Sequence, residues 1–229
     1  MRENNASVLK AGGITFRYSE NSPLILDDFT AEFTGGCITA LTGKNGCGKT
    51  TLARIIMGIL KPEKGRLSLN GEDLAELSLA ETGRRIGYVM QDPGRQIFST
   101  SVMDEMKYGL ENMVRAGLLD KDDVESRALE YLELFDLSGK KDAFPFALSQ
   151  GEKQRLVLAA VTALEPGFLM LDEPTAALDP VRRAALGDHL KKVRDEKGCG
   201  IIVITHDRSF VADCADREVR MQNGGGIYV

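Results

Sequence analysis

The feature that most constrains this chain is a glycine-rich loop between an apolar run and a helical segment. The loop Gly43–Thr50 (GKNGCGKT) follows the strand-like run Cys37–Thr42 and precedes TLARIIMGIL, which has helical periodicity. Glycines in such a loop let successive backbone N–H groups point inward and hold phosphate oxygens beside the positive end of the new helix. We therefore expect nucleotide phosphates here, with Lys49 on the phosphates and the Thr50 hydroxyl on Mg²⁺.

Apolar runs typical of strands alternate with helical segments along the rest of the chain. Arg85–Met90, Phe168–Asp172 and Ile201–Thr205 are nearly continuous apolar runs, as in strands that are buried on both faces. This alternation predicts an α/β fold with a mostly parallel core sheet. Val8–Phe16 and Ile25–Phe33 are joined by a turn-rich segment, and they indicate N-terminal antiparallel strands instead.

The middle of the chain has a different character. No run between Gln91 and Phe168 is typical of a strand, and Ser101–Ala116 and Lys121–Leu137 have helical patterns. We therefore expect one domain in which an α/β core, residues 1–91 and 155–229, carries a helical insertion, residues 92–154.

Composition narrows the class of protein. The 229 residues are 43% hydrophobic and 28% charged, the balance of an ordinary globular chain. The net charge of −5, without a concentrated basic stretch, argues against a nucleic-acid partner. The four dispersed cysteines are expected to be free thiols. The polar N-terminus and the shortness of every apolar run predict neither a signal peptide nor a membrane span.

Two adjacent carboxylates, Asp172 and Glu173, follow four apolar residues at the end of a predicted buried strand. In open α/β sheets, ligands bind at the carboxyl ends of the strands. Neighbouring residues on a strand point in opposite directions, so the two carboxylates can have different tasks. We expect Asp172 to hold Mg²⁺ and Glu173 to polarise an attacking water molecule.

A second helix start also draws attention. Ser149 and Glu152 have the spacing of a capping box, and Gly151 lies between them. A well-capped helix explains the serine and the glutamate, whereas a helix start without a Cβ also lets a phosphate approach closely. The residues alone leave both interpretations open.

Together these motifs resemble those of the ATP-binding subunits of ABC transporters, over essentially the whole chain. GKNGCGKT resembles the Walker A motif, Gln91 the Q-loop, LSQGEKQR the signature motif, FLMLDEP the Walker B motif, Ala176–Asp179 the D-loop and Thr205–Asp207 the switch-histidine loop. The segment after Gln91, QDPGRQIFSTSVMDEMKYGLEN, is similar to that of energy-coupling-factor (ECF) ATPases, which drive uptake of vitamins, cobalt and nickel.

The resemblance implies a P-loop NTPase fold with ATP and Mg²⁺ as cofactors. It implies catalytic roles for Lys49, Gln91, Glu173 and His206, with Glu173 as general base or as the group that orients water, and metal contacts from Thr50, Gln91 and Asp172. Nucleotide contacts are expected from Tyr18, Gly43, Asn45, Gly46, Cys47, Gly48, Lys49, Thr50, Thr51, Ser149, Gly151 and Asp179. Tyr18 occupies the place of the aromatic ring that stacks on adenine, and Phe16 is the alternative.

The resemblance also implies partners. Two ATP-binding subunits, identical or paralogous, pair head to tail, so that each ATP lies between the Walker A loop of one and Ser149–Gly151 of the other. A transmembrane subunit docks on the helical insertion, which places the chain peripherally at the cytoplasmic face of the membrane. The alternative is a soluble ABC-type ATPase, for example in cluster assembly. The sequence does not identify a transported substrate.

Overall fold

The computed structural model describes residues 7–176, 178–222 and 224–228, so Ala177 of the predicted D-loop lies outside the described residues. Six strands form the larger sheet: β3 (Ile38–Gly43), β6 (Ile86–Val89), β7 (Phe168–Asp172), β8 (Gly200–Ile204), β9 (Arg217–Gln222) and β10 (Gly225–Tyr228). Their order is β10-β9-β3-β8-β7-β6. The pairs from β9 to β6 are parallel, and only the β10–β9 pair is antiparallel among the described residues. The predicted mostly parallel core sheet is confirmed.

A second, antiparallel sheet lies against the first. It contains β1 (Val8–Phe16), β2 (Leu26–Thr34), β4 (Lys64–Leu69) and β5 (Glu72–Asp73), in the order β2-β1-β4-β5. The N-terminal antiparallel pair is confirmed by the β1–β2 register. The sequence does not predict β4, whose first three residues are exposed and in which only Leu67 and Leu69 are buried. Two buried positions are too few to display the period-two alternation that identifies a strand.

Seven α-helices complete the part of the chain that the structure describes. They are α1 (Lys49–Ile56), α2 (Leu79–Arg85), α3 (Val102–Arg115), α4 (Asp123–Leu134), α5 (Gln150–Thr162), α6 (Pro180–Lys197) and α7 (Arg208–Cys214). The two helices predicted in the middle of the chain are present as α3 and α4. Arg85 ends α2 instead of starting the next strand. The boundary drawn between residues 154 and 155 lies inside α5, so the helical segment and the α/β core share this helix.

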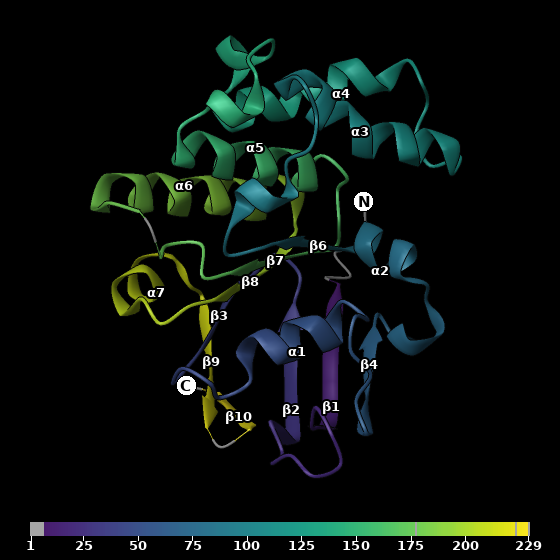
Figure 1. The fold of residues 1–229 in the computed structure, drawn as a ribbon, viewed down its shortest axis with the longest axis vertical. Helices are drawn as coiled ribbons and strands as arrows, with labels where there is room; N and C mark the ends of the chain where they lie inside the picture. Colours follow the sequence, from purple (N-terminus) through teal and green to yellow (C-terminus); the bar gives the residue numbers. More distant parts are fainter. Residues whose placement is uncertain (1–6, 177, 223, 229) are drawn as a thin grey trace.

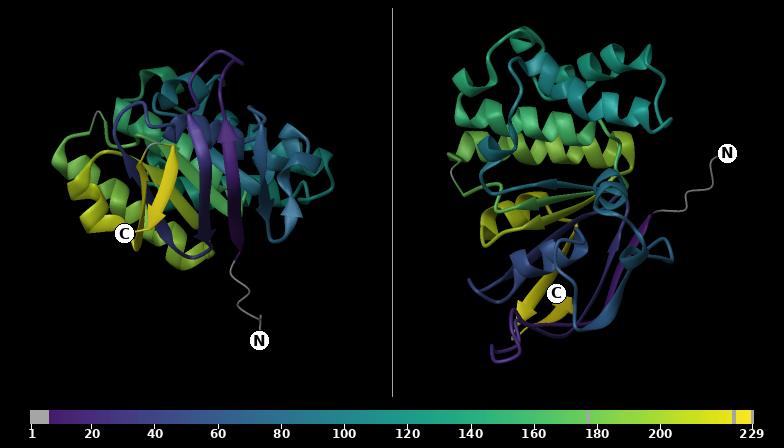
Figure 2. Two further views of the ribbon diagram at one scale, coloured as in Figure 1. Left: turned by 90° about the horizontal axis from the view of Figure 1, so that it is seen from below. Right: turned by 45° about the vertical axis from the view of Figure 1, so that its right-hand side comes forward.

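The six-stranded sheet is covered on both faces (Figures 1 and 2). Helices α5 and α6 pack on one face with α3 and α4 behind them, whereas α1 and the antiparallel sheet cover the other face. Strand β7 is buried throughout: Leu169 and Leu171 pack with the helices, and Phe168 and Met170 pack with the antiparallel sheet. Burial of both faces explains why this strand has a continuous apolar sequence.

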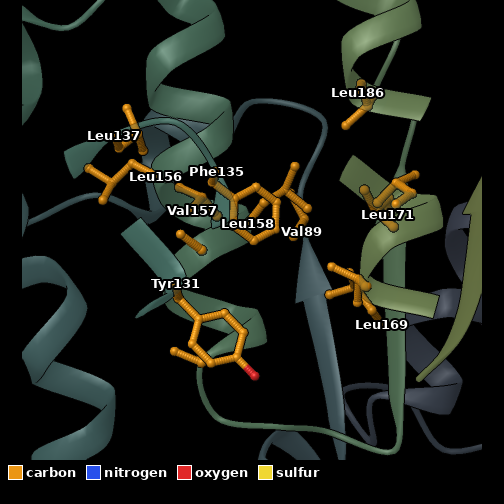
Figure 3. Packing of buried hydrophobic residues seen from close by; sticks show 14 of the residues in the cluster. Val89, Tyr131, Phe135, Leu137, Leu156, Val157, Leu158, Leu169, Leu171 and Leu186 are labelled. Carbon is orange, nitrogen blue, oxygen red and sulfur yellow. The ribbon is translucent and has the colours of Figure 1, made fainter. Parts of the chain in front are cut away.

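The helical side of this core is dense. Figure 3 shows Tyr131 and Phe135, from α4 and the residue after it, among the leucines of α5 and opposite Val89, Leu169 and Leu171. Tyr131 and Phe135 are fully buried. This contact joins the helical segment to the sheet as one continuous core.

The sheet order places the predicted motifs together. The carboxyl ends of β3, β8, β7 and β6 lie side by side at one edge of the sheet. Strand β3 leads into the glycine-rich loop and β8 leads to His206. Strand β7 leads to Glu173 and β6 leads to Gln91. The parallel topology therefore brings four segments that are far apart in the sequence to one edge.

Candidate nucleotide site

Backbone geometry requires glycine in the loop between β3 and α1. Gly43, Gly46 and Gly48 have φ values of 147°, 80° and 103°, which L side chains rarely adopt. A Cβ on Gly43 would lie 2.7 Å from the carbonyl oxygen of Met221, and one on Gly48 would lie 2.9 Å from the side chain of Leu26. The loop thus forms a close-packed turn whose backbone is held against two strands.

Lys49 is fixed inside this loop. It opens α1, its side chain is buried, and its Nζ donates to the carbonyl oxygens of Gly43 at 2.9 Å and Lys44 at 3.2 Å. Carbonyl oxygens orient the ammonium without neutralising its charge. The first turn of α1 adds the positive end of a helix at the same place. The arrangement suits a bound phosphate chain.

The two candidate adenine contacts lie in different environments. Phe16 is buried in the core, whereas the Tyr18 ring is 56% exposed. The two rings meet edge to face, with centroids 5.1 Å apart. The Tyr18 hydroxyl lies 3.1 Å from the hydroxyl of Thr51 in the first turn of α1. Tyr18 therefore presents an open ring beside the loop, and Phe16 does not.

Asp172 provides a buried carboxylate beside the start of α1. The Tyr88 hydroxyl donates to its Oδ2 at 3.2 Å, and Oδ1 is buried with no hydrogen-bond partner among the described residues. Burial raises the pKa of Asp172, and hydrogen bonding by Thr50 and Tyr88 opposes that rise. An unsatisfied carboxylate oxygen next to a threonine hydroxyl offers the oxygen ligands that Mg²⁺ prefers. These residues fit the ion.

Glu173 and His206 contact each other. The His206 Nδ1 lies 3.0 Å from the Glu173 carboxylate, and the Glu173 N–H donates to the Ile204 carbonyl at 2.8 Å. Glu173 has a φ of 49°, a left-handed conformation that costs about 1–3 kcal/mol for a residue with a side chain. The His206 side chain is 63% exposed and that of Glu173 14%. The expected base and the expected phosphate contact thus form one pair at the sheet edge.

A cavity of about 1060 Å³ adjoins the loop and His206. Gly43, Lys44, Asn45, Gly46 and Cys47 line it on one side. Ser149 and Gly151 do not contribute to this lining among the described residues. The second predicted anion site is therefore no part of this cavity's lining.

The start of α5 has the geometry of a capped helix. The Ser149 hydroxyl accepts from the Glu152 N–H at 3.4 Å, and the Glu152 carboxylate accepts from the Ser149 N–H at 2.8 Å. Gly151 has no left-handed φ, and a Cβ there would meet only the Arg182 side chain at 3.5 Å. Neither the backbone nor packing among the described residues requires a glycine at position 151.

Asp179 lies near this helix start. It caps α6 by accepting from the Arg182 N–H at 2.9 Å, and its carboxylate lies 3.3 Å from Arg182 Nε. The same arginine side chain runs past Gly151. Asp179 and the start of α5 therefore form one surface of the molecule.

The structure adds two residues that the sequence analysis did not select. The Tyr88 hydroxyl supports Asp172, and the Gln96 side chain bonds the backbone on both sides of Val89. No sequence signal marks Tyr88: it lies near Asp172 because β6 pairs with β7 and aligns Tyr88 with Met170, two residues before Asp172. No local pattern marks Gln96.

Comparison with known proteins identifies the fold family. A family model described as "ABC transporter" matches residues 26–176, which is more than half of the chain. The chain belongs to the ABC transporter family. A protein of Pyrococcus furiosus named as an ABC transporter ATP-binding protein is 37% identical over 217 residues, which are 95% of this chain and 81% of that protein. A relative from Methanosarcina acetivorans is 38% identical over 213 residues, but this chain spans only 33% of it.

Two solved structures have the same fold. CbiO1 of Clostridium perfringens, described as part of the ABC transporter complex cbiONQ, superposes with a TM-score of 0.87 at 33% identity over 96% of this chain and 86% of that chain. An ATP-binding subunit of an ABC transporter gives a TM-score of 0.80 at 27% identity, covering 96% and 88%.

This ABC ATP-binding subunit is thus a P-loop NTPase that hydrolyses ATP with Mg²⁺, as its sequence predicted. The helices of the described residues include none that is long and apolar enough to cross a bilayer.

Proposed function

We propose that this subunit is the motor of a membrane importer of the ECF type, which takes up a vitamin or a metal ion. The likeness to CbiO1, a subunit of a transporter complex, carries the proposal. The segment after Gln91, which is similar to that of ECF ATPases, supports it from the sequence.

The described geometry supports distinct tasks for the residues of the loop and its surroundings. Lys49 and the backbone N–H groups of Gly43–Thr50 hold the phosphates. Thr50, Asp172 and Gln91 hold Mg²⁺, which would neutralise phosphate charge as the bond to the γ-phosphate breaks. The open ring of Tyr18 stacks on the adenine, a task that burial denies to Phe16.

Glu173 and His206 act on the attacking water. Glu173 takes a proton from this water or orients the water. The left-handed backbone fixes the Glu173 carboxylate at the end of β7. The exposed His206 ring turns toward the γ-phosphate when nucleotide is present. The contact between the two side chains keeps both groups beside the phosphate loop in the free subunit.

Each ATP-binding site is completed by a second subunit, identical or paralogous. Ser149 and Gly151 of one chain face the phosphates on the loop of the other, and Asp179 crosses the interface. The glycine at position 151, which nothing in the described chain requires, supports this arrangement. A phosphate held by the loop of the second subunit would explain this glycine, because a helix start without a Cβ allows a phosphate to approach closely.

A transmembrane subunit docks on the helical segment. The helical segment carries two exposed aromatic pairs, which we call the aromatic surface: Phe98 with Tyr108, and Phe144 with Phe146. The Val102 N–H donates to the Ala143 carbonyl at 3.1 Å, which joins the start of α3 to the segment that carries Phe144 and Phe146. Exposed apolar patches of this kind mark interaction sites. Docking there places the chain peripherally at the cytoplasmic face of the membrane.

Co-purification tests this function. A tagged chain, expressed in its source cells and extracted in mild detergent, is expected to bring down an integral membrane protein. Phe98→Asp should abolish this recovery by placing a charge on the aromatic surface. Leu118→Asp, at an equally exposed residue beyond the other end of α3, is the matched control and should retain the partner. Recovery without any membrane protein would favour the soluble ATPase.

A further inference from the structure

Strand β6 is an edge strand of the six-stranded sheet, with β7 on its only strand-bearing side among the described residues. On its open side the Met90 N–H donates to Gln96 Oε1 at 2.7 Å, and Gln96 Nε2 donates to the Tyr88 carbonyl at 2.9 Å. One side chain therefore satisfies both a donor and an acceptor of the open edge.

The chemistry of the amide explains why glutamine serves here. A primary amide carries one carbonyl acceptor and an N–H donor, the same groups as a peptide unit. Gln96 thus takes the place of a neighbouring strand's peptide, and it covers edge groups that would otherwise need water or another chain. An ionised glutamate keeps the acceptor but has no donor for the Tyr88 carbonyl.

These two hydrogen bonds of Gln96, which we call the clamp, close a small loop that begins at Gln91. Within the loop, Asp92 accepts from the Gly94 N–H at 3.2 Å and pairs with Arg95 at 3.3 Å. Gln96 ends the short helix η2 (Pro93–Gln96), and its amide reaches back across the base of the loop. Gln91 therefore directly follows a residue, Met90, whose N–H the Gln96 side chain holds.

A buried carboxylate holds the backbone of the segment that directly follows the clamp. Glu105 of α3 is buried, and its carboxylate accepts from the N–H groups of Phe98 at 3.1 Å and Ser99 at 2.9 Å. Phe98 belongs to the aromatic surface. Along the chain, the clamp thus lies between Gln91 and Phe98, and buried Glu105 holds the segment that follows it.

We propose that Gln96 is a positioning residue, which holds Gln91 in place for its contact with Mg²⁺ and the γ-phosphate. The inference rests on the role proposed above for Gln91. Gln96 itself touches neither nucleotide nor metal. It acts by fixing the backbone at Met90, the residue directly before Gln91, relative to Tyr88, whose hydroxyl supports Asp172.

Gln96→Ala tests the clamp in the full chain. We expect faster amide hydrogen exchange at Met90, a kcat for MgATP hydrolysis lower by about tenfold, and unchanged affinity for ATP measured without Mg²⁺. Gln96→Glu should keep Met90 protected and still lose activity, because it lacks the donor. Arg95→Ala, the exposed neighbour, is the matched control and should leave all three values unchanged. Thermal unfolding verifies that each variant is folded.

A double-variant cycle shows whether Gln96 acts through Gln91. If it does, Gln91→Ala lowers kcat, and adding Gln96→Ala lowers it no further. Additive losses in the double variant would overturn the inference, as would a parental kcat in Gln96→Ala with an unprotected Met90 amide. A parental kcat in Gln91→Ala would instead refute the role proposed for Gln91 itself.

Discussion

The Lys49 ammonium is held by two backbone carbonyls of its own loop, and no carboxylate takes part in those two bonds. Asp172 likewise has few partners: one carboxylate oxygen accepts from the Tyr88 hydroxyl, and the other has no hydrogen-bond partner among the described residues. A buried polar atom without a partner costs free energy. Both residues are thus prepared for charged groups that only a ligand brings.

Lys49→Ala should bind ATP about 10–100-fold more weakly, because it removes a charge-assisted contact to phosphate. ATP hydrolysis should fall with it. Titration with a fluorescent ATP analogue and a steady-state ATPase assay measure both. Lys61→Ala removes the same charge from an exposed position after α1 and serves as the control. Near-normal binding by Lys49→Ala would refute the assignment of this loop.

At the scale of elements, two helices begin with the same capping box. Ser78 and Glu81 form it at α2, and Ser149 and Glu152 form it at α5. Hydrogen bonds from the Ser149 backbone and side chain lower the pKa of Glu152. Because local bonds account for the α5 box completely, the box alone does not establish an anion site. The α5 box differs from the α2 box in that it contains a glycine, Gly151.

The pair of boxes separates capping from nucleotide contact. Ser149→Ala and Ser78→Ala should each lower the free energy of unfolding by about 1 kcal/mol. Only Ser149→Ala should also lower ATP hydrolysis. Equal ATPase activity in both variants would leave Ser149 as a cap alone. Urea unfolding and an ATPase assay make the comparison.

The pH dependence of the α5 box has a defined sign. Glu152 has a lowered pKa in the folded chain, so its stabilisation is complete above its unfolded value near 4.5 and is lost as the pH falls through the lower folded value. The stability deficit of Ser149→Ala should therefore shrink in urea unfolding below about pH 4.5. A deficit that is constant down to pH 3 would contradict the ionised box.

At the scale of the whole molecule, the two proposed half-sites of one chain are formed by different elements. The loop lies beside β3, whereas Ser149 and Gly151 lie at the start of α5. The aromatic surface lies on the helical segment. Two composite sites in a head-to-tail pair would use both half-sites and leave that surface free for a membrane partner.

Glu173→Gln should bind MgATP and barely hydrolyse it, because an amide cannot take the proton of the attacking water. It also removes a negative charge beside the γ-phosphate. The variant should therefore accumulate as an ATP-bound dimer, seen as a doubled mass in size-exclusion chromatography with light scattering. Asp172→Asn is the comparison and should bind MgATP weakly instead. Parental hydrolysis by Glu173→Gln would exclude Glu173 as the base, and a monomer at saturating ATP would favour a paralogous partner.

The sequence by itself determined the phosphate loop, the paired carboxylates and the mostly parallel character of the core sheet. These features are local: a strand, a loop and a helix within about twenty residues, or a buried strand with acids at its end. The parallel topology followed because continuous apolar strands must be covered on both faces. For that reason the edge that gathers Lys49, Asp172, Glu173 and His206 was predictable.

Only the tertiary structure decided what depends on distant contacts. The Tyr88 hydroxyl reaches Asp172 across 84 residues of sequence, and packing buries Phe16 while it leaves Tyr18 exposed. Strand β4 is recognisable only beside β1, because pairing replaces the alternation it lacks. The role of Gln96 also depends on contacts that exist only in the folded sheet. The open edge of β6 exists only after the sheet has formed, so no residue pattern within the chain records the need to cover it.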